Sequence, residues 1–316
     1  MAEPLIHIGY HKTATSWLQR RLFLPDCGYQ QIANHREVWE KIISPLEHRF
    51  DTDAVGGFFR DRIKDCPDGV VPVISSEPLC GNPFYGANGR ARNAQRLAAL
   101  FPKARILITI RAQSSMLRST YMQYLHRGGT ETPLSFFTAR SIPGYPRFDP
   151  EHFCYDALAS LYLDLFEQVL VVPQEALIQS AADFSRAINV FAGAPPDACP
   201  TRVDSEVPSP SEAMAPVLRR MNHLRFGALN RNPFVYMFGP EGTSYRAMGR
   251  LGRSNFVKGL SFKPVSKVVK AQFADHYDAS NQRLDQLGIC PFPLKAYPGI
   301  TSDQKPAQPD MVSAAE

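Results

Sequence analysis

Residues 5–22 read as a strand, a polar turn and a helix, and they constrain the fold more than any other part of the chain. The apolar residues 5–8 suit a short strand, the turn 9–16 reads Gly-Tyr-His-Lys-Thr-Ala-Thr-Ser, and apolar residues with helical spacing follow. A strand that leads directly into a helix directs backbone N–H groups and the positive end of the helix dipole at an anion. We therefore expect an anion-binding turn here, with Thr15 or Ser16 capping the helix.

The rest of the chain alternates between predicted strands and predicted helices. The run Arg105–Ile110 is almost continuously apolar, as expected of a strand that is covered on both faces. Such alternation predicts an α/β fold of three layers, with a central parallel β-sheet flanked by helices. Besides the first strand, we expect strands at 70–75, Arg105–Ile110 and 169–172, and helices near 51–64, 89–101, 113–126, 150–167, 183–191, 208–225 and 271–287.

The composition is that of a folded globular chain. Its 316 residues are 44% hydrophobic, which is enough for a large core. No apolar run approaches the roughly 20 residues of a membrane-spanning helix, and residues 1–4 lack the basic and apolar regions of a secretory signal. We expect one folded domain over residues 1–300, a cytoplasmic location, and a disordered tail over 301–316, which has no aromatic residue.

Neither the cysteines nor the histidines form a metal-binding pattern. Six cysteines are scattered along the chain without a Cys-x-x-Cys pair, which favours free thiols. No zinc-ligand spacing occurs, so we expect no metal site.

Positive charge is concentrated in residues 246–270. The net charge of the chain is +5, whereas this segment alone has seven basic residues and no acidic one. A solvated basic face is the common interpretation of such a cluster, and an anion-binding flap is the sharper one. Nucleic acid is the weakest of the three interpretations, because no recognised nucleic-acid module surrounds the segment.

The order of residues in the turn differs from one phosphate-binding motif and resembles another. A Walker A loop reads Gly-x-x-x-x-Gly-Lys-(Ser/Thr), whereas Lys12 lies three residues after Gly9. The order Lys-Thr-Ala-Thr-Ser at 12–16 resembles the 5′-phosphosulfate loop of the sulfotransferases that use 3′-phosphoadenosine 5′-phosphosulfate (PAPS). Their common form is Lys-(Thr/Ser)-Gly-Thr-(Thr/Ser). Ala14 replaces the usual glycine, and alanine is tolerated there if its φ is negative.

Two further residues fit the same family. Arg111 follows the predicted strand Arg105–Ile110, and Ser119 comes eight residues later in a predicted helix. The resemblance implies that this pair holds the 3′-phosphate, because an arginine and a serine at this spacing do so in the family. A guanidinium makes bidentate, charge-assisted contacts to phosphate, and a hydroxyl on the helix adds another donor.

The catalytic base is expected after the strand 70–75. Glu77 places a carboxylate at the carboxyl end of that strand, the edge at which open α/β sheets bind their ligands. The resemblance implies that Glu77 is the base, since the family's base emerges after this strand and is a glutamate in many carbohydrate enzymes. His11, next to Lys12, is the competing candidate.

The resemblance covers most of residues 4–300 and implies a P-loop-like fold and transfer of a sulfuryl group from PAPS to an acceptor hydroxyl, with no metal. It implies that Lys12 stabilises the leaving group. Arg250 and Arg253 are the nearest counterparts of a C-terminal Arg-Lys-Gly stretch that in many members closes on the 3′-phosphate. The loop that would hold the 5′-phosphate consists of Lys12, Thr13, Ala14, Thr15, Ser16 and Trp17.

The acceptor and two other functions stay open from the sequence. By analogy with bacterial family members that use a glutamate base, we expect a saccharide or glycolipid acceptor. We expect no nucleic-acid partner and no integral membrane segment, and the sequence leaves open whether the chain forms a homodimer. The alternatives are a nucleotide-dependent kinase with an atypical phosphate loop, which needs Mg²⁺, and a non-catalytic nucleotide-binding scaffold.

Overall fold

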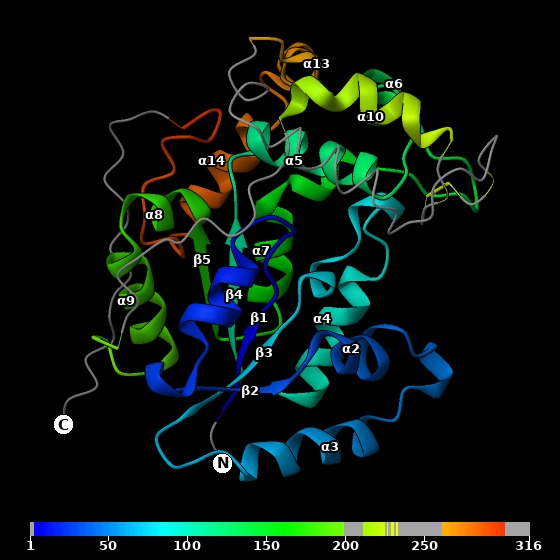
Figure 1. The fold of residues 1–316 in the computed structure, drawn as a ribbon. Coiled ribbons are helices and arrows are strands. Elements are labelled where there is room, and N and C mark those ends of the chain that lie inside the picture. Colours follow the sequence, from blue (N-terminus) through cyan, green and yellow to red (C-terminus); the bar gives the residue numbers. More distant parts are fainter. Residues whose placement is uncertain are drawn as a thin grey trace.

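A parallel sheet of five strands lies at the centre of the computed structural model, which describes residues 3–198, 211–224, 226, 229–230, 232 and 261–300 (Figure 1). The strands lie in the order β2-β3-β1-β4-β5, and every neighbouring pair is parallel. The expected fold class, α/β with a central parallel sheet between helices, is confirmed. The strands are β1 Leu5–His7, β2 Tyr29–Ala33, β3 Val71–Ser75, β4 Arg105–Ile110 and β5 Gln168–Pro173.

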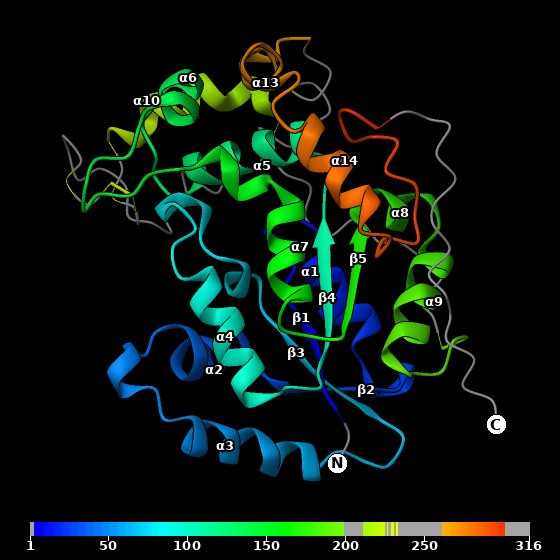
Figure 2. The same cartoon turned by 180° about the vertical axis from the view of Figure 1, so that it is seen from behind.

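Helices cover both faces of the sheet, as the two opposite views show (Figures 1 and 2). The short helix α1 continues as one π-helical turn, Leu18–Leu22, and two 3₁₀ turns, Glu77–Cys80 and Pro150–Phe153, lie next to the site described below. The described helices are α1 Thr15–Trp17, α2 His35–Val38, α3 Thr52–Lys64, α4 Arg90–Leu100, α5 Gln113–His126, α6 Pro133–Thr138, α7 Tyr155–Leu163, α8 Gln174–Gln179, α9 Ala181–Ala192, α10 Ala215–Asn222, α13 Pro264–Phe273 and α14 Asp278–Gln286.

Two hydrophobic cores lie on opposite faces of the sheet because successive strand residues point to opposite sides. On one face, Leu5 of β1 and Leu107 of β4 belong to the same core as Trp17 and Phe184, so α1 and α9 cover this face. The other core contains the intervening strand residues together with side chains of α4 and α7. Its strand members include Ile6, Ile74, Ile106, Ile108 and Ile110, and Ile8 directly after β1 belongs to it as well.

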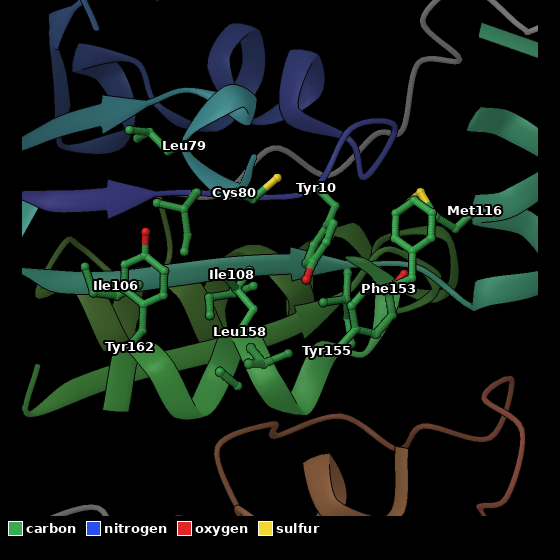
Figure 3. Close-up of a cluster of buried hydrophobic side chains, with 14 of the residues drawn as sticks. Tyr10, Leu79, Cys80, Ile106, Ile108, Met116, Phe153, Tyr155, Leu158 and Tyr162 are labelled. Atoms are coloured by element: carbon green, nitrogen blue, oxygen red, sulfur yellow. The ribbon is translucent and has the colours of Figure 1, made fainter. Parts of the chain in front are cut away.

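Tyr10 anchors the turn after β1 in the second core. Its side chain is fully buried, and its ring centroid lies 4.9 Å from that of Tyr155 and 5.8 Å from that of Phe153 (Figure 3). The residue before Tyr10 is Gly9 and the residue after it is His11, so packing of this one aromatic ring positions the start of the polar turn.

Several element boundaries differ from the prediction because tertiary contacts override local helical pattern. The single helix predicted over 271–287 is wrong: α13 ends at Phe273 and α14 begins at Asp278. Between them, Tyr277 is fully buried and its hydroxyl donates a hydrogen bond to the Pro150 carbonyl, 3.0 Å away. The predicted helix over 150–167 is also shorter, since the 3₁₀ turn Pro150–Phe153 precedes α7.

The strand β2 was not predicted, because its polar residues resemble those of a loop. Its sequence is Tyr-Gln-Gln-Ile-Ala, in which Gln31 is exposed. β2 is the edge strand next to β3, and the Gln31 side chain donates hydrogen bonds to the carbonyls of Gln19 and Phe23.

Some predictions lie outside the described residues. These are the tail 301–316, Arg250 and Arg253, and most of the basic segment 246–270. In the described part of the chain, five cysteines are free thiols, and no group of three or more acidic, histidine or cysteine side chains could hold a metal ion. Among the same residues, no helix has the length and apolar character to cross a membrane.

Candidate functional site

The strand order brings the predicted site residues to one edge of the sheet. β1 lies between β3 and β4, with His7 in register with Ser75 on one side and Leu107 on the other. The chain therefore leaves three neighbouring strands at their carboxyl ends to form the turn 9–16, the segment with Glu77 and the segment with Arg111. This edge is where open parallel sheets bind ligands.

The turn after β1 has an unusual backbone at two residues other than glycine. The φ of Lys12 is +66° and that of Ala14 is +68°, both left-handed. Ala14, rather than Thr15 or Ser16, is the N-cap of α1, and no side chain caps the helix. A left-handed residue followed by helical residues turns successive N–H groups to one side, which forms an anion-binding nest. The predicted cap is therefore wrong, and the first N–H groups of α1 remain available to an anion.

The left-handed Ala14 also means that a negative φ, the condition for tolerating alanine, is not met. A left-handed backbone costs a residue with a Cβ about 1–2 kcal/mol. Strain of this kind persists where the surrounding structure imposes it, and it gathers at ligand-binding turns.

Ala14→Gly is expected to raise the free energy of unfolding by about 1 kcal/mol, because glycine adopts this φ without steric cost. Urea unfolding followed by circular dichroism measures the difference. Ala187→Gly in α9 is the matched control and is expected to lower the same quantity by about 1 kcal/mol. A destabilised Ala14→Gly protein would contradict the left-handed turn.

A chain of buried hydrogen bonds ties the turn to the three strands beneath it. The Thr13 hydroxyl donates to the Tyr10 carbonyl at 2.5 Å and lies 2.6 Å from the Thr109 hydroxyl of β4. His7 bridges β4 and β3: its Nε2 lies 3.0 Å from Thr109 Oγ1 and its Nδ1 lies 2.8 Å from Ser75 Oγ. The Thr13 hydroxyl thus faces the interior, and Thr13 can offer an anion only its N–H.

The Tyr10 carbonyl at one end of this series of hydrogen bonds fixes the donor and the acceptor of every bond in it. Because the Tyr10 carbonyl can only accept, Thr13 donates to it and accepts the Thr109 proton. Thr109 must then accept from His7 Nε2–H, which leaves Nδ1 to accept from the Ser75 hydroxyl. Burial lowers the pKa of His7 to about 4, with Glu77 acting in the opposite direction, so His7 is neutral at neutral pH.

Only glycine fits at position 9, because the hydrogen-bonded side chains of Thr109 and His7 lie very close to its backbone. A Cβ at Gly9 would lie 1.8 Å from Thr109 Oγ1 and 2.4 Å from His7 Nε2. Any other residue would push apart the groups that hold the turn on the sheet, so the glycine at the end of β1 serves packing rather than a positive φ.

The other turn residues divide between surface and core. Lys12 and Ser16 are exposed, so both can reach a bound ligand. Trp17 is buried, with its ring 6.2 Å from that of Phe184, and it can contribute only backbone groups to a phosphate site. The Thr15 hydroxyl is buried, lowers the pKa of Glu77, and makes no hydrogen bond of normal geometry.

The two candidate bases form one pair. His11 Nδ1 lies 2.8 Å from Glu77 Oε2, with 12% of the histidine side chain and 29% of the glutamate side chain exposed. Burial by itself raises the pKa of Glu77, but the hydrogen bond and charge of His11, with smaller effects of Thr15 and His7, hold it below its usual range. Glu77 is therefore an ionised carboxylate at neutral pH, oriented by His11.

Arg111 lies on the opposite side of the turn at the end of β4. Its guanidinium makes a long contact, 3.5 Å, to the Lys12 carbonyl, and its own carbonyl accepts a 2.6 Å hydrogen bond from Tyr155. Burial lowers the pKa of Arg111, and the nearby Glu175 opposes that effect. Ser119 is buried in the second turn of α5, which begins two residues after Arg111.

Glu175 is a supporting residue to which the sequence analysis gave no role. Its Oε1 accepts the Ala112 N–H at 3.1 Å, and its Oε2 accepts the Tyr297 hydroxyl at 3.1 Å. It thereby fixes the segment between β4 and α5 to the C-terminal part of the chain. An acidic residue directly after the strand β5 was the only available sequence signal.

No protein-family model and no curated protein sequence matches the chain. The solved structures with a distant likeness to it include two sulfotransferases. A sulfotransferase from Alicyclobacillus acidocaldarius is 23% identical over 71% of this chain and 91% of that chain, with a TM-score of 0.47. Mouse sulfotransferase SULT7A1 complexed with PAP is 12% identical over 89% of this chain and 88% of that chain, with a TM-score of 0.38. Likeness at this distance assigns no activity to the chain.

Proposed function

We propose that the chain transfers the sulfuryl group of PAPS to an acceptor hydroxyl. The observation that carries the proposal is the uncapped left-handed turn at Ala14, which lies between Arg111 at the end of β4 and Glu77 beyond the end of β3. The reaction needs two anion-binding positions for the donor and a base for the acceptor. The turn and Arg111 supply the first two, and the ionised Glu77 supplies the third.

The donor would bind along this edge of the sheet with its two phosphate ends on different turns. The N–H groups at the start of α1, together with the exposed Ser16 hydroxyl, would hold the 5′-phosphate. Arg111 and Ser119 would hold the 3′-phosphate, which is the group that distinguishes this nucleotide from ATP. Arg250 and Arg253 stay in the proposal as further 3′-phosphate contacts.

The reaction would be an in-line displacement at sulfur. The acceptor oxygen forms a bond to sulfur while the bond from sulfur to the bridging oxygen breaks, and 3′,5′-diphosphoadenosine (PAP) leaves. The acceptor proton passes to the Glu77 carboxylate, which His11 orients through its 2.8 Å contact. Lys12 would stabilise the negative charge that develops on the bridging oxygen.

The acceptor in this proposal is a saccharide or a glycolipid, and the chain is a cytoplasmic, carbohydrate-directed enzyme of bacterial type. The ionised Glu77 carboxylate beside His11 supports this class of acceptor. An acceptor panel of sugars and glycolipids, read by mass, identifies the product by its added sulfo group.

The first test is a thermal-shift comparison of PAP with ATP–Mg²⁺. We expect PAP to raise the melting temperature, since a ligand that binds only the folded state stabilises it. A shift with ATP–Mg²⁺ alone would favour a kinase and overturn the proposal. A shift with PAP but no sulfuryl transfer to any acceptor and no donor hydrolysis would favour a non-catalytic scaffold.

Arg111→Ala is expected to weaken PAP binding by about 1.5–3 kcal/mol, the value of hydrogen bonds to charged groups. This corresponds to a rise in Kd of roughly 10- to 150-fold, measured by calorimetry. Arg60→Ala, an exposed arginine of α3, is the matched control and should leave the Kd unchanged. An unchanged affinity in Arg111→Ala would reject the 3′-phosphate role.

A further inference from the structure

A cavity of about 540 Å³ lies at the amino end of α4. The Asn93 side chain of the same helix donates a hydrogen bond to the Leu79 carbonyl, 3.3 Å away, so α4 contacts the 3₁₀ turn that begins with Glu77. The lining residues are Glu47, residues 86–92, Asp149, Glu151 and His152.

His152 is a buried side chain in the cavity lining whose polar atoms have no partner. It is only 2% exposed, and neither of its ring nitrogens makes a hydrogen bond with any residue that the structure describes. Its ring packs 4.9 Å from that of Tyr10, the residue before His11. Burial lowers the pKa of His152 to about 3, with smaller contributions from the charges of Arg90 and His11, so the ring is neutral. A buried imidazole without partners costs free energy that a ligand in the cavity would recover.

The rest of the cavity interior offers mainly hydrogen-bond donors. Buried nitrogens of Arg90 (Nη1) and Arg92 (Nε) have no hydrogen-bond partner among the described residues. Gly89 is the N-cap of α4 and no side chain caps the helix, so the N–H groups of its first turn are open to a ligand. This helix has 11 residues, which gives its amino end the positive dipole potential that favours an anion.

Two of the three acidic residues of the lining, Asp149 and Glu151, have protein partners of their own. Glu151 Oε1 lies 2.9 Å from His276 Nε2, and Asp149 Oδ1 accepts the Glu151 N–H at 3.0 Å. Glu47 is exposed at the rim. The unsatisfied groups are therefore donors on Arg90, Arg92 and α4, together with the neutral His152, and this set suits an oxyanion.

We propose that this cavity is the acceptor subsite and that it binds an oxyanion group of the acceptor, a carboxylate or a sulfate, through Arg90, the first-turn N–H groups of α4 and His152. The inference rests on the proposed function and narrows its substrate class to acidic saccharides. The reacting hydroxyl then lies at the His11–Glu77 pair while the acidic group lies against α4. His152 and Arg90 are binding residues in this assignment.

The test is an NMR titration of the PAP-bound protein with glucuronate, with glucose as the neutral match and inorganic sulfate as a second oxyanion, at constant ionic strength. We expect saturable binding of glucuronate and sulfate, shifts of the His152 ring signals, and much weaker binding of glucose. Arg90→Gln should raise the Kd for glucuronate roughly 10- to 100-fold, as loss of a charge-assisted hydrogen bond does. Arg60→Gln is the control, and His152→Gln should weaken binding of both oxyanions.

Two readouts separate this inference from the proposed function. Arg90→Gln should keep the wild-type Kd for PAP, whereas Arg111→Ala should lose PAP affinity and keep that for glucuronate. A PAP-binding wild type that binds neither oxyanion, or variants that bind glucuronate like the wild type, would overturn the subsite. Failure of the wild type to bind PAP counts against the proposed function. The same titration without PAP then tests whether the cavity binds an oxyanion.

Discussion

Glu77→Gln is expected to lower kcat by roughly 10²- to 10⁴-fold, the usual contribution of a general base, while the Kd for PAP stays unchanged. Glutamine keeps the shape of the side chain and can still accept the hydrogen bond from His11, but it takes no proton at neutral pH. Sulfuryl transfer is followed by mass with the acceptor that the panel identifies, and the Kd is measured by calorimetry. Glu40→Gln, an exposed glutamate, is the control.

The pH profile of the same reaction gives a second readout. Since the pKa of Glu77 is held below its usual range, the base is ionised at neutral pH, and kcat/KM should fall only when the pH drops below about 4.3, the ordinary glutamate value. His11→Ala removes the hydrogen bond that lowers this pKa and leaves burial, which raises it. The acid limb of the profile should therefore move to higher pH in that variant.

The two variants together decide which member of the pair takes the proton. If Glu77→Gln turns over at the wild-type rate while His11→Ala does not, the histidine is the base and the glutamate only orients it. A lowered kcat in both variants, with the shifted acid limb in His11→Ala, supports the assignment of Glu77.

Lys12→Ala is expected to lower kcat by roughly 10²- to 10³-fold, because it removes a preorganised cation from the position at which charge develops on the leaving group. The Lys12 side chain is exposed on a left-handed turn residue, so alanine there keeps the same backbone strain and the protein should remain folded. Single-turnover measurements with the enzyme in excess over the donor separate the chemical step from binding.

Lys103→Ala is the matched control for this variant. Lys103 is exposed and precedes the amino end of β4, at the opposite edge of the sheet from the turn. Its loss should leave kcat unchanged. A near-normal kcat in Lys12→Ala would remove Lys12 from the mechanism.

The strands and long helices were predictable where local pattern and tertiary packing agree. β4 and α5 have the bounds that the sequence predicts. For β4 the reason is that an apolar run covered on both faces has no competing structure. The break between α13 and α14 was not predictable, since it depends on burial of Tyr277 against a segment more than 100 residues earlier in the chain. Pro264, at the first turn of α13, was an overlooked start signal.

The candidate site was predictable as a set of residue types and not as a set of contacts. Spacing along the chain singled out Lys12, Glu77 and Arg111, because each follows a predicted strand. It gave His11 and Glu77 as alternative candidates for the catalytic base, whereas in the folded protein a hydrogen bond joins the two side chains. It gave no role to His152, whose isolation in the cavity exists only after residues far apart in sequence have packed around it.

The amino-acid sequence by itself determined an alternating α/β chain with a polar turn after its first strand, because hydrophobic period and turn composition are local properties. The tertiary structure decided which turns become neighbours, since the order β3-β1-β4 depends on long-range pairing that no local pattern encodes. It also decided the left-handed backbone of Ala14, which local preference opposes. Packing of Tyr10 below the turn and the buried hydrogen bonds of Thr13 and His7 hold that backbone in place.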